Sequence, residues 1–320
     1  MTRSRVATTQ LGRTGMEITR LGFGAWAIGG GNWEFGWGPQ DDAQSIAAIH
    51  HALAAGINWI DTAAAYGLGH SEEIVGAALD GLSERPHVFT KASLVEGPGR
   101  TVVHRLKRDS VLREAEASLK RLRVDAIDLY QIHWPDPEPD IEEGWAALAE
   151  LKEEGLVRHI GVSNFGIEQL RRIQQIAPVE TLQPPYSLVD RDAESQLLPF
   201  VEREGIGVIV YSPMGSGLLT CKMTRERIEQ LAEDDWRKHD ARFREPRLSE
   251  HLALVQRLTA VAERHGSTPG AVAVAWTLRN PAVDAAIIGF RRPDQVDPIL
   301  PAVGLELSAA DLAYLDGASS

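Results

Sequence analysis

Short apolar runs rich in β-branched residues alternate along the chain with longer segments of helical periodicity. In the helical segments apolar residues recur every three or four positions, as at Leu112, Ala115, Leu119 and Leu122, which predicts one buried face per helix. Eight strand–helix units favour a parallel closed barrel, the α/β class (β/α)8 TIM barrel, over an open doubly wound sheet. The predicted strands span residues 21–24, 57–61, 87–91, 127–133, 157–162, 180–183, 206–211 and 285–288.

The rest of the chain fits one barrel domain over residues 1–320 with additions at its ends. Residues 9–11 and 17–19 flank a glycine turn and predict an N-terminal β-hairpin that plugs one end of the fold. A short C-terminal helix is expected near residues 309–316. The charged residues 220–247 form the longest interruption, and we predict a lid loop beside the barrel mouth because loops of this length are usually functional.

Composition and charge argue against several classes of partner. The formal charge of −12 and the pI of about 5.3 disfavour a nucleic-acid partner, which would need clustered cations. No apolar run approaches the ~20 residues that span a bilayer, so no membrane association is expected. Residues 1–15 have no apolar core of signal-peptide length, and the one cysteine, Cys221, cannot form an intrachain disulfide. We expect a cytoplasmic protein without an obligate protein partner.

Four polar residues follow apolar runs and are expected at the carboxyl ends of strands, where parallel barrels gather catalytic groups: Asp61, Tyr66, Lys91 and His133. Carbonyl reduction by a nicotinamide needs a proton source, and Tyr66 can supply it if a nearby cation lowers its pKa from about 10. Lys91 fits that cation, and Asp61 can keep it ionised. His133 can hydrogen-bond the substrate oxygen. The pattern predicts hydride-transfer chemistry.

Each of these residues alone would more often be structural, as a packed aromatic, a solvated lysine, a satisfied histidine or a turn cap. Their occurrence together at successive strand ends favours chemistry. A competing hypothesis is a metal-dependent barrel hydrolase that uses His133, Asp128 and Asp61. Asp128 falls early in its strand, and the sequence has no H-x-H pair, so no metal site is expected.

The motifs that carry these residues resemble those of the aldo-keto reductase family. They are GINWIDTAAAYGLGHSEEIVGAAL (56–79), VFTK (88–91), LYQIHWPDP (129–137) and GLVRHIGVSNF (155–165). The resemblance runs from near Leu11 to near Pro298 and is closest to the bacterial and channel-β-subunit-like branch. It implies a (β/α)8 barrel, NADP as the cofactor with NADPH preferred over NADH, and catalytic Asp61, Tyr66, Lys91 and His133.

The same resemblance implies a cofactor extended across the barrel mouth. Ser163, Asn164 and Gln183 match contacts of the nicotinamide carboxamide, and Tyr211 matches the aromatic that stacks on its ring. Arg291 and Arg292, at the start of a helix expected from Pro293, could bind a 2′-phosphate. The other expected cofactor contacts are Trp26, Asp61, Ser212, Pro213, Met214, Gly215, Ser216, Gly217, Leu218, Gly289 and Gln295.

Aromatic residues suggest the substrate pocket, because an apolar wall with a few polar groups suits a small carbonyl compound. The chain ends at Ser320 soon after its last expected helix, which suggests a short C-terminal loop and broad specificity toward aldehydes and ketones. An alternative function is that of an NADP(H)-binding redox-sensing or regulatory subunit with slow turnover, as in channel-β-subunit-like relatives. The expected pocket residues are Trp26, Trp33, Trp37, Tyr66, His133 and Trp134.

Overall fold

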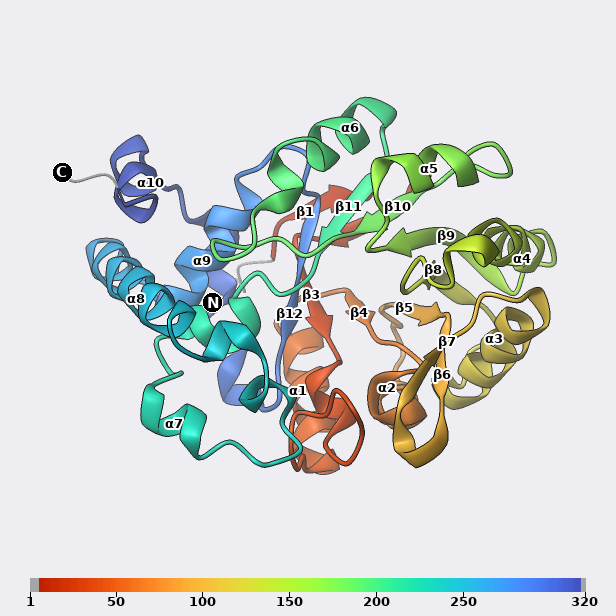
Figure 1. Cartoon of the computed structure of the whole chain (residues 1–320), viewed down its shortest axis with the longest axis horizontal. Helices are drawn as coiled ribbons and strands as arrows, with labels where there is room; N and C mark the ends of the chain where they lie inside the picture. The colour runs from red at the N-terminus through yellow and green to blue at the C-terminus, as the bar shows by residue number, and fades with distance from the viewer. Residues whose placement is uncertain (1–5, 318–320) are drawn as a thin grey trace.

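The computed structural model describes residues 6–317, and within them eight parallel strands close into a barrel (Figure 1). The closure is made where the last strand pairs with the first, with Ala286 beside Leu21. The predicted fold class is confirmed, and every predicted strand is present to within two residues at its ends. The barrel strands are β3 (Leu21–Gly24), β4 (Trp59–Asp61), β5 (His87–Ala92), β8 (Ile127–Ile132), β9 (Val157–Ser163), β10 (Thr181–Gln183), β11 (Gly207–Val210) and β12 (Ala285–Gly289).

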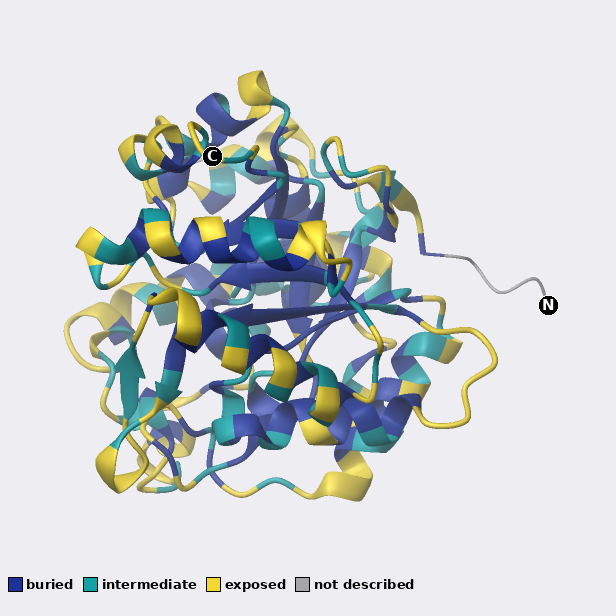
Figure 2. Ribbon diagram, turned by 90° about the vertical axis from the view of Figure 1, so that its right-hand side faces the viewer, coloured by how far each residue is buried: buried dark blue, intermediate teal, exposed yellow. Residues whose placement is uncertain are grey.

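Helices surround the barrel and turn their apolar faces toward it, as the dark inner faces in Figure 2 show. The first helix begins where the Asp41 carboxylate accepts a hydrogen bond from the Gln44 amide, 2.8 Å away. In the third helix Ala115 and Leu122 are fully buried, as its periodicity predicted. The helices are α1 (Asp42–Ala54), α2 (His70–Leu79), α3 (Arg108–Leu122), α4 (Ile141–Glu153), α5 (Ile167–Ile173), α6 (Leu197–Glu204), α7 (Arg225–Glu229), α8 (Arg247–Arg264), α9 (Pro269–Leu278) and α10 (Ala309–Leu315).

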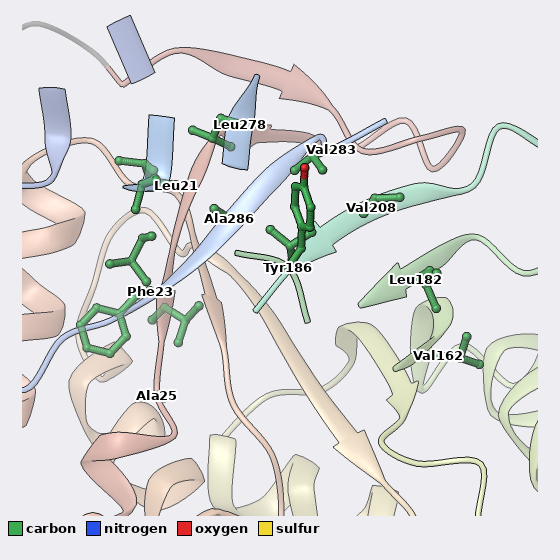
Figure 3. Packing of buried hydrophobic residues seen from close by; sticks show 14 of the residues in the cluster. Leu21, Phe23, Ala25, Val162, Leu182, Tyr186, Val208, Leu278, Val283 and Ala286 are labelled. Carbon is green, nitrogen blue, oxygen red and sulfur yellow. The ribbon is translucent and has the colours of Figure 1, made fainter. Parts of the chain in front are cut away.

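Two apolar layers form the core, one between strands and helices and one inside the barrel. Figure 3 shows the outer layer, in which Leu21 and Phe23 of β3 point away from the barrel axis. The inner layer includes Trp59, whose indole nitrogen donates to the Thr19 carbonyl at 2.8 Å. The strands β1 (Thr8–Gln10) and β2 (Glu17–Thr19) pair as the predicted hairpin, and their connecting residues join this inner layer and close that end of the barrel.

The structure departs from the sequence-based expectations at three places. A second hairpin, β6 (Leu94–Glu96) with β7 (Val102–His104), follows β5 and was not predicted. The helix expected from Pro293 is only a 3-10 turn that ends at Gln295. Residues 220–247 are not a plain loop, because they contain α7 and further 3-10 turns.

The short C-terminal helix is confirmed as α10. Residues 1–5, part of the segment used to assess a signal peptide, and residues 318–320 lie outside the described residues. Between residues 6 and 317, no helix combines the length and apolar character needed to cross a bilayer.

The inner core makes Gly22 a sensitive position, because a Cβ there would lie 2.2 Å from the buried Trp59 ring. Overpacking of this kind costs about 1–3 kcal/mol, so we expect Gly22→Ala to lower the free energy of unfolding by that amount. Gly304→Ala is the matched control, since a Cβ there meets no atom within 4 Å. Chemical denaturation, monitored by circular dichroism, measures the free energy of unfolding of both variants. Equal stability of the two variants would contradict this packing.

Candidate active site

The structure brings the four candidate catalytic residues together at the carboxyl ends of the barrel strands. Asp61 is the last residue of β4, and Lys91 lies on the neighbouring strand β5. His133 directly follows β8. Tyr66 begins a 3-10 turn after β4, and its ring stands edge-on to His133 with centroids 5.6 Å apart. Chain connectivity and strand order therefore deliver all four groups to one place.

Lys91 is held by three oxygen atoms. Its Nζ lies 2.5 Å from Asp61 Oδ1, 2.9 Å from the Thr62 carbonyl and 3.3 Å from the Tyr66 hydroxyl. Burial lowers the pKa of Lys91, and the negative charge of Asp61 acts in the opposite direction. The carboxylate thus supports a charged ammonium where water cannot reach it.

The pKa of Tyr66 is shifted in the direction opposite to the one that the sequence predicts. Burial, followed by the charge of Asp61, raises the pKa of Tyr66 well above the usual 10. The sequence predicts that Lys91 lowers this pKa, whereas the loss of water and the nearby carboxylate both raise it. The phenol is therefore protonated near neutral pH, which is the form that can donate a proton.

His133 is a neutral imidazole in this site. Burial, and then the positive charge of Lys91, lower the pKa of His133 well below its usual value of 6.5, with a further contribution from His104. A neutral imidazole has one nitrogen that donates and one that accepts. Its backbone carbonyl accepts a hydrogen bond of 2.9 Å from Asn164 Nδ2, which ties β8 to β9 at the mouth.

Two buried glutamines complete the surroundings of Asp61. Gln183 Nε2 donates to Asp61 Oδ2 at 2.8 Å, and Gln131 Nε2 lies 3.4 Å from the same oxygen. Gln183, expected at the nicotinamide carboxamide, thus also holds the carboxylate. Gln131 was missed by the sequence analysis. Its position two residues before His133, on the same face of the strand, was the available signal.

A cavity of about 1320 Å³ opens above these residues. Tyr211 Oη donates to Asn164 Oδ1 at 2.8 Å, and Asn164 Nδ2 donates to Ser163 Oγ at 3.1 Å. Ser163 Oγ in turn donates to the Gln183 carbonyl at 2.7 Å. These four residues, predicted as nicotinamide contacts, form one connected polar network on the cavity wall.

The loop after β11 bends sharply along the same cavity. Ser212, Gly215, Ser216 and Gly217 all have positive φ, and such clusters of left-handed residues concentrate at ligand sites. Every expected cofactor contact lines the cavity except Leu218, whose contact with the cofactor stays a prediction. Leu218 is instead buried in a small apolar cluster beneath residues 220–247.

The two arginines after β12 have different surroundings. The Arg291 guanidinium donates to Gln40 Oε1 at 2.6 Å and to the carbonyls of Pro39 at 2.5 Å and Trp37 at 3.2 Å. These bonds tie the loop between β3 and α1, here called the first loop, to the end of β12. Arg292 is half exposed and pairs with Asp294 at 3.0 Å. Arg292 is therefore the more available cation.

Residues 220–247 lie against the first loop across the mouth (Figure 1). Trp236 stacks on Trp26 with centroids 5.2 Å apart, and its backbone amide donates to the Gly36 carbonyl. Asp234 accepts a 2.7 Å hydrogen bond from the Asn32 amide. Trp26 also stacks on Tyr66, so the segment reaches the candidate catalytic residues through one intermediate ring.

The residues of the competing metal-site hypothesis do not converge. Asp128 accepts a hydrogen bond from the Val88 amide and lies beside His87, at the start of β5. His133 lies beyond the other end of that pair of strands. Across residues 6–317, no group of three or more histidine, cysteine or carboxylate side chains is arranged to hold a metal ion.

Comparisons with known proteins agree with this geometry. The model of the Aldo/keto reductase family matches residues 20–320. The chain is 42% identical over 306 residues to Aldo-keto reductase YhdN of Bacillus subtilis, covering 95% of this chain and 90% of that protein. It is 36% identical over 319 residues to an NADH-specific methylglyoxal reductase of Escherichia coli, covering 95% and 96%.

A solved structure extends the likeness to three dimensions. The glycerol dehydrogenase AKR11B4 from Gluconobacter oxydans superposes with a TM-score of 0.87 at 37% identity, covering 97% of this chain and 94% of that one. Likeness in sequence and in structure thus spans nearly the whole length of both partners. The chain belongs to the aldo/keto reductase family, whose members are oxidoreductases that act on small carbonyl compounds with a nicotinamide cofactor.

Proposed function

We propose that the protein is an NADPH-dependent reductase of aldehydes and ketones in which Tyr66 is the general acid. The observation that carries this proposal is the Tyr66 hydroxyl at 3.3 Å from the Lys91 ammonium, below a large cavity. A bound nicotinamide would supply the hydride to the carbonyl carbon. Tyr66 donates its proton to the carbonyl oxygen, and His133 hydrogen-bonds the same oxygen and orients it.

Lys91 and Asp61 act through Tyr66. When the phenol gives up its proton, the ammonium at 3.3 Å stabilises the phenolate that remains. Asp61 keeps that ammonium charged, and Gln131 and Gln183 hold the carboxylate in place. Lys91, Asp61, Gln131 and Gln183 are buried, which strengthens the electrostatic interactions among them.

The residues of the cavity suit a dinucleotide. Ser163, Asn164 and Tyr211 offer polar and aromatic contacts for a nicotinamide ring. The left-handed loop of residues 212–217 allows close approach of a pyrophosphate, and arginine and lysine side chains from residues 222–247 add positive charge. We further propose that residues 220–247 are a lid that covers the bound cofactor. The stacking of Trp236 on Trp26 would hold this lid against the first loop.

The relatives support a small oxygenated substrate but leave the cofactor open. One is named for methylglyoxal and another for glycerol. The first is also named as NADH-specific, so the NADPH preference proposed for this chain depends on its own residues. Because Arg291 is fully engaged with the first loop, we assign the contact with a 2′-phosphate mainly to Arg292.

We expect Tyr66→Phe to lower kcat for aldehyde reduction by ~10²–10⁴-fold, because a positioned general acid contributes that much. The dissociation constant for NADPH should stay within about twofold, since the aromatic ring that stacks on Trp26 is retained. Steady-state kinetics and fluorescence titration measure the two quantities. Wild-type turnover in Tyr66→Phe would overturn the assignment of the acid.

The raised pKa of Tyr66 predicts the pH dependence of reduction. The protonated phenol is required, so activity persists below its pKa and falls only as the pH rises through it, above about 10. Lys91→Met should lower kcat more than Asp61→Asn, because methionine removes the cation that stabilises the phenolate, whereas asparagine only weakens the support of that cation. Profiles of kcat/KM against pH test this. An alkaline limb near neutrality in the wild type, or a more damaging Asp61→Asn, would contradict it.

Arg292→Ala should weaken NADPH binding by ~10–150-fold, the value of one charged hydrogen bond of about 1.5–3 kcal/mol, and leave NADH binding nearly unchanged. Asp294→Ala is the opposite control, because it frees Arg292 and removes a negative charge beside it, so NADPH should bind more tightly. Dissociation constants for both cofactors decide the matter. Equal losses for NADPH and NADH in Arg292→Ala would show that this arginine acts structurally.

A further inference from the structure

The unpredicted β6–β7 hairpin is a fixed wall of the cavity. It is attached to the first loop at two points, where Arg100 Nε donates to the Asn32 carbonyl at 2.6 Å and the Val102 amide donates to Glu34 Oε2 at 2.8 Å. Leu94, Val102 and His104 from this hairpin line the cavity. The hairpin therefore contributes side chains to the space above Tyr66 and His133.

The cavity lining is divided by chemistry. The cationic side chains on it come from residues 222–247 and from Arg291 and Arg292, on the side proposed for the cofactor. The wall made by the first loop, the hairpin and Trp134 is aromatic or aliphatic, and His104 is the ionisable residue on it. A substrate lying on Tyr66 and His133 would meet this second wall.

His104 is a polar residue of that wall whose ring nitrogens make no hydrogen bond to the described residues. Its Nδ1 is shielded from solvent and makes no hydrogen bond within residues 6–317, although Asp136 Oδ2 lies 3.1 Å away at an unsuitable angle. The side chain is nevertheless 36% exposed, so the accessible part of the ring is the edge that carries Nε2. His104 is also close enough to His133 to influence its titration. His104 and His133 line the same cavity, so a substrate held by His133 can also reach the His104 ring.

We propose that His104 is a specificity-determining residue that selects neutral carbonyl compounds with a hydroxyl group near the reacting carbonyl. This inference rests on the reductase function proposed above. The imidazole Nε2 hydrogen-bonds the hydroxyl oxygen, while the aromatic wall packs against the carbon chain of the substrate. Polar recognition in an otherwise apolar pocket discriminates between substrates, because a substrate lacking the hydroxyl leaves the nitrogen unpaired.

The charge of this wall favours a neutral substrate over an anionic one. Asp136, 60% exposed, places a carboxylate beside His104 and offsets any positive charge on the imidazole. Lys91 is buried and already paired with Asp61, so it offers no charge to a substrate carboxylate. Asp136 does not line the cavity, but its charge beside His104 would repel a substrate carboxylate at that ring, and the residues of this wall offer no free cation to compensate.

D-glyceraldehyde and 2-methylbutanal test the proposed preference for a hydroxyl group. The two aldehydes have the same heavy-atom skeleton, but 2-methylbutanal has methyl groups where glyceraldehyde has hydroxyl groups. The measured quantity is the ratio of kcat/KM for glyceraldehyde to that for 2-methylbutanal, which cancels the intrinsic reactivity of each aldehyde when variants are compared. We expect His104→Leu to lower this ratio by about 3–10-fold, the value of one neutral hydrogen bond. His104→Gln, which keeps a polar amide, should restore it to within about twofold.

His51→Leu is the control, because the His51 side chain is 40% exposed and pairs with Asp297, and neither residue lines the cavity. If His104→Leu does not fold, His104→Phe takes its place. An unchanged ratio, or an equal fall with leucine and glutamine, would overturn the role of His104 while leaving the reductase intact. A wild type that reduces neither aldehyde with NADPH or NADH would instead refute the proposed function, and this inference with it.

Discussion

A buried ammonium must replace its water with protein oxygen atoms, and at Lys91 this requirement organises the whole site. Asp61, the Thr62 carbonyl and the Tyr66 hydroxyl are the three oxygen groups that meet it. They can do so because β4 and β5 are neighbours in the barrel, with Asp61 beside Phe89 and therefore two residues from the level of Lys91. The barrel register thus places the Lys91 ammonium beside Asp61, and the turn after β4 brings the Tyr66 phenol to it.

Around this fixed centre, three segments far apart in sequence build the mouth. The first loop contacts the β6–β7 hairpin through Arg100. It contacts residues 220–247 through Trp236. Arg291 ties the same loop to the end of β12. The first loop is therefore the shared support of the aromatic wall and of the cationic side. Since both sides depend on one loop, we infer that occupation of the cofactor side also steadies the substrate side.

Sequence patterns were sufficient for the barrel and for the convergence of Asp61, Tyr66, Lys91 and His133, because strand order follows chain order. They were insufficient where distant contacts decide the outcome. The partner of Arg291 is Gln40, 251 residues away, so the sequence could not show that its guanidinium was already engaged. The pKa of Tyr66 depends on burial, which no local pattern encodes. The β6–β7 hairpin is held by contacts with Asn32 and Glu34 of the first loop, which no local pattern shows.

Direct hydride transfer above a protonated Tyr66 is the central claim, and the fate of the cofactor's hydrogen tests it most directly. The aldehyde would be incubated with the protein and NADPH that carries deuterium at both C4 positions, and the alcohol examined by mass spectrometry and NMR. The account predicts one deuterium per product, bonded to the former carbonyl carbon. An alcohol product without deuterium at that carbon would contradict it.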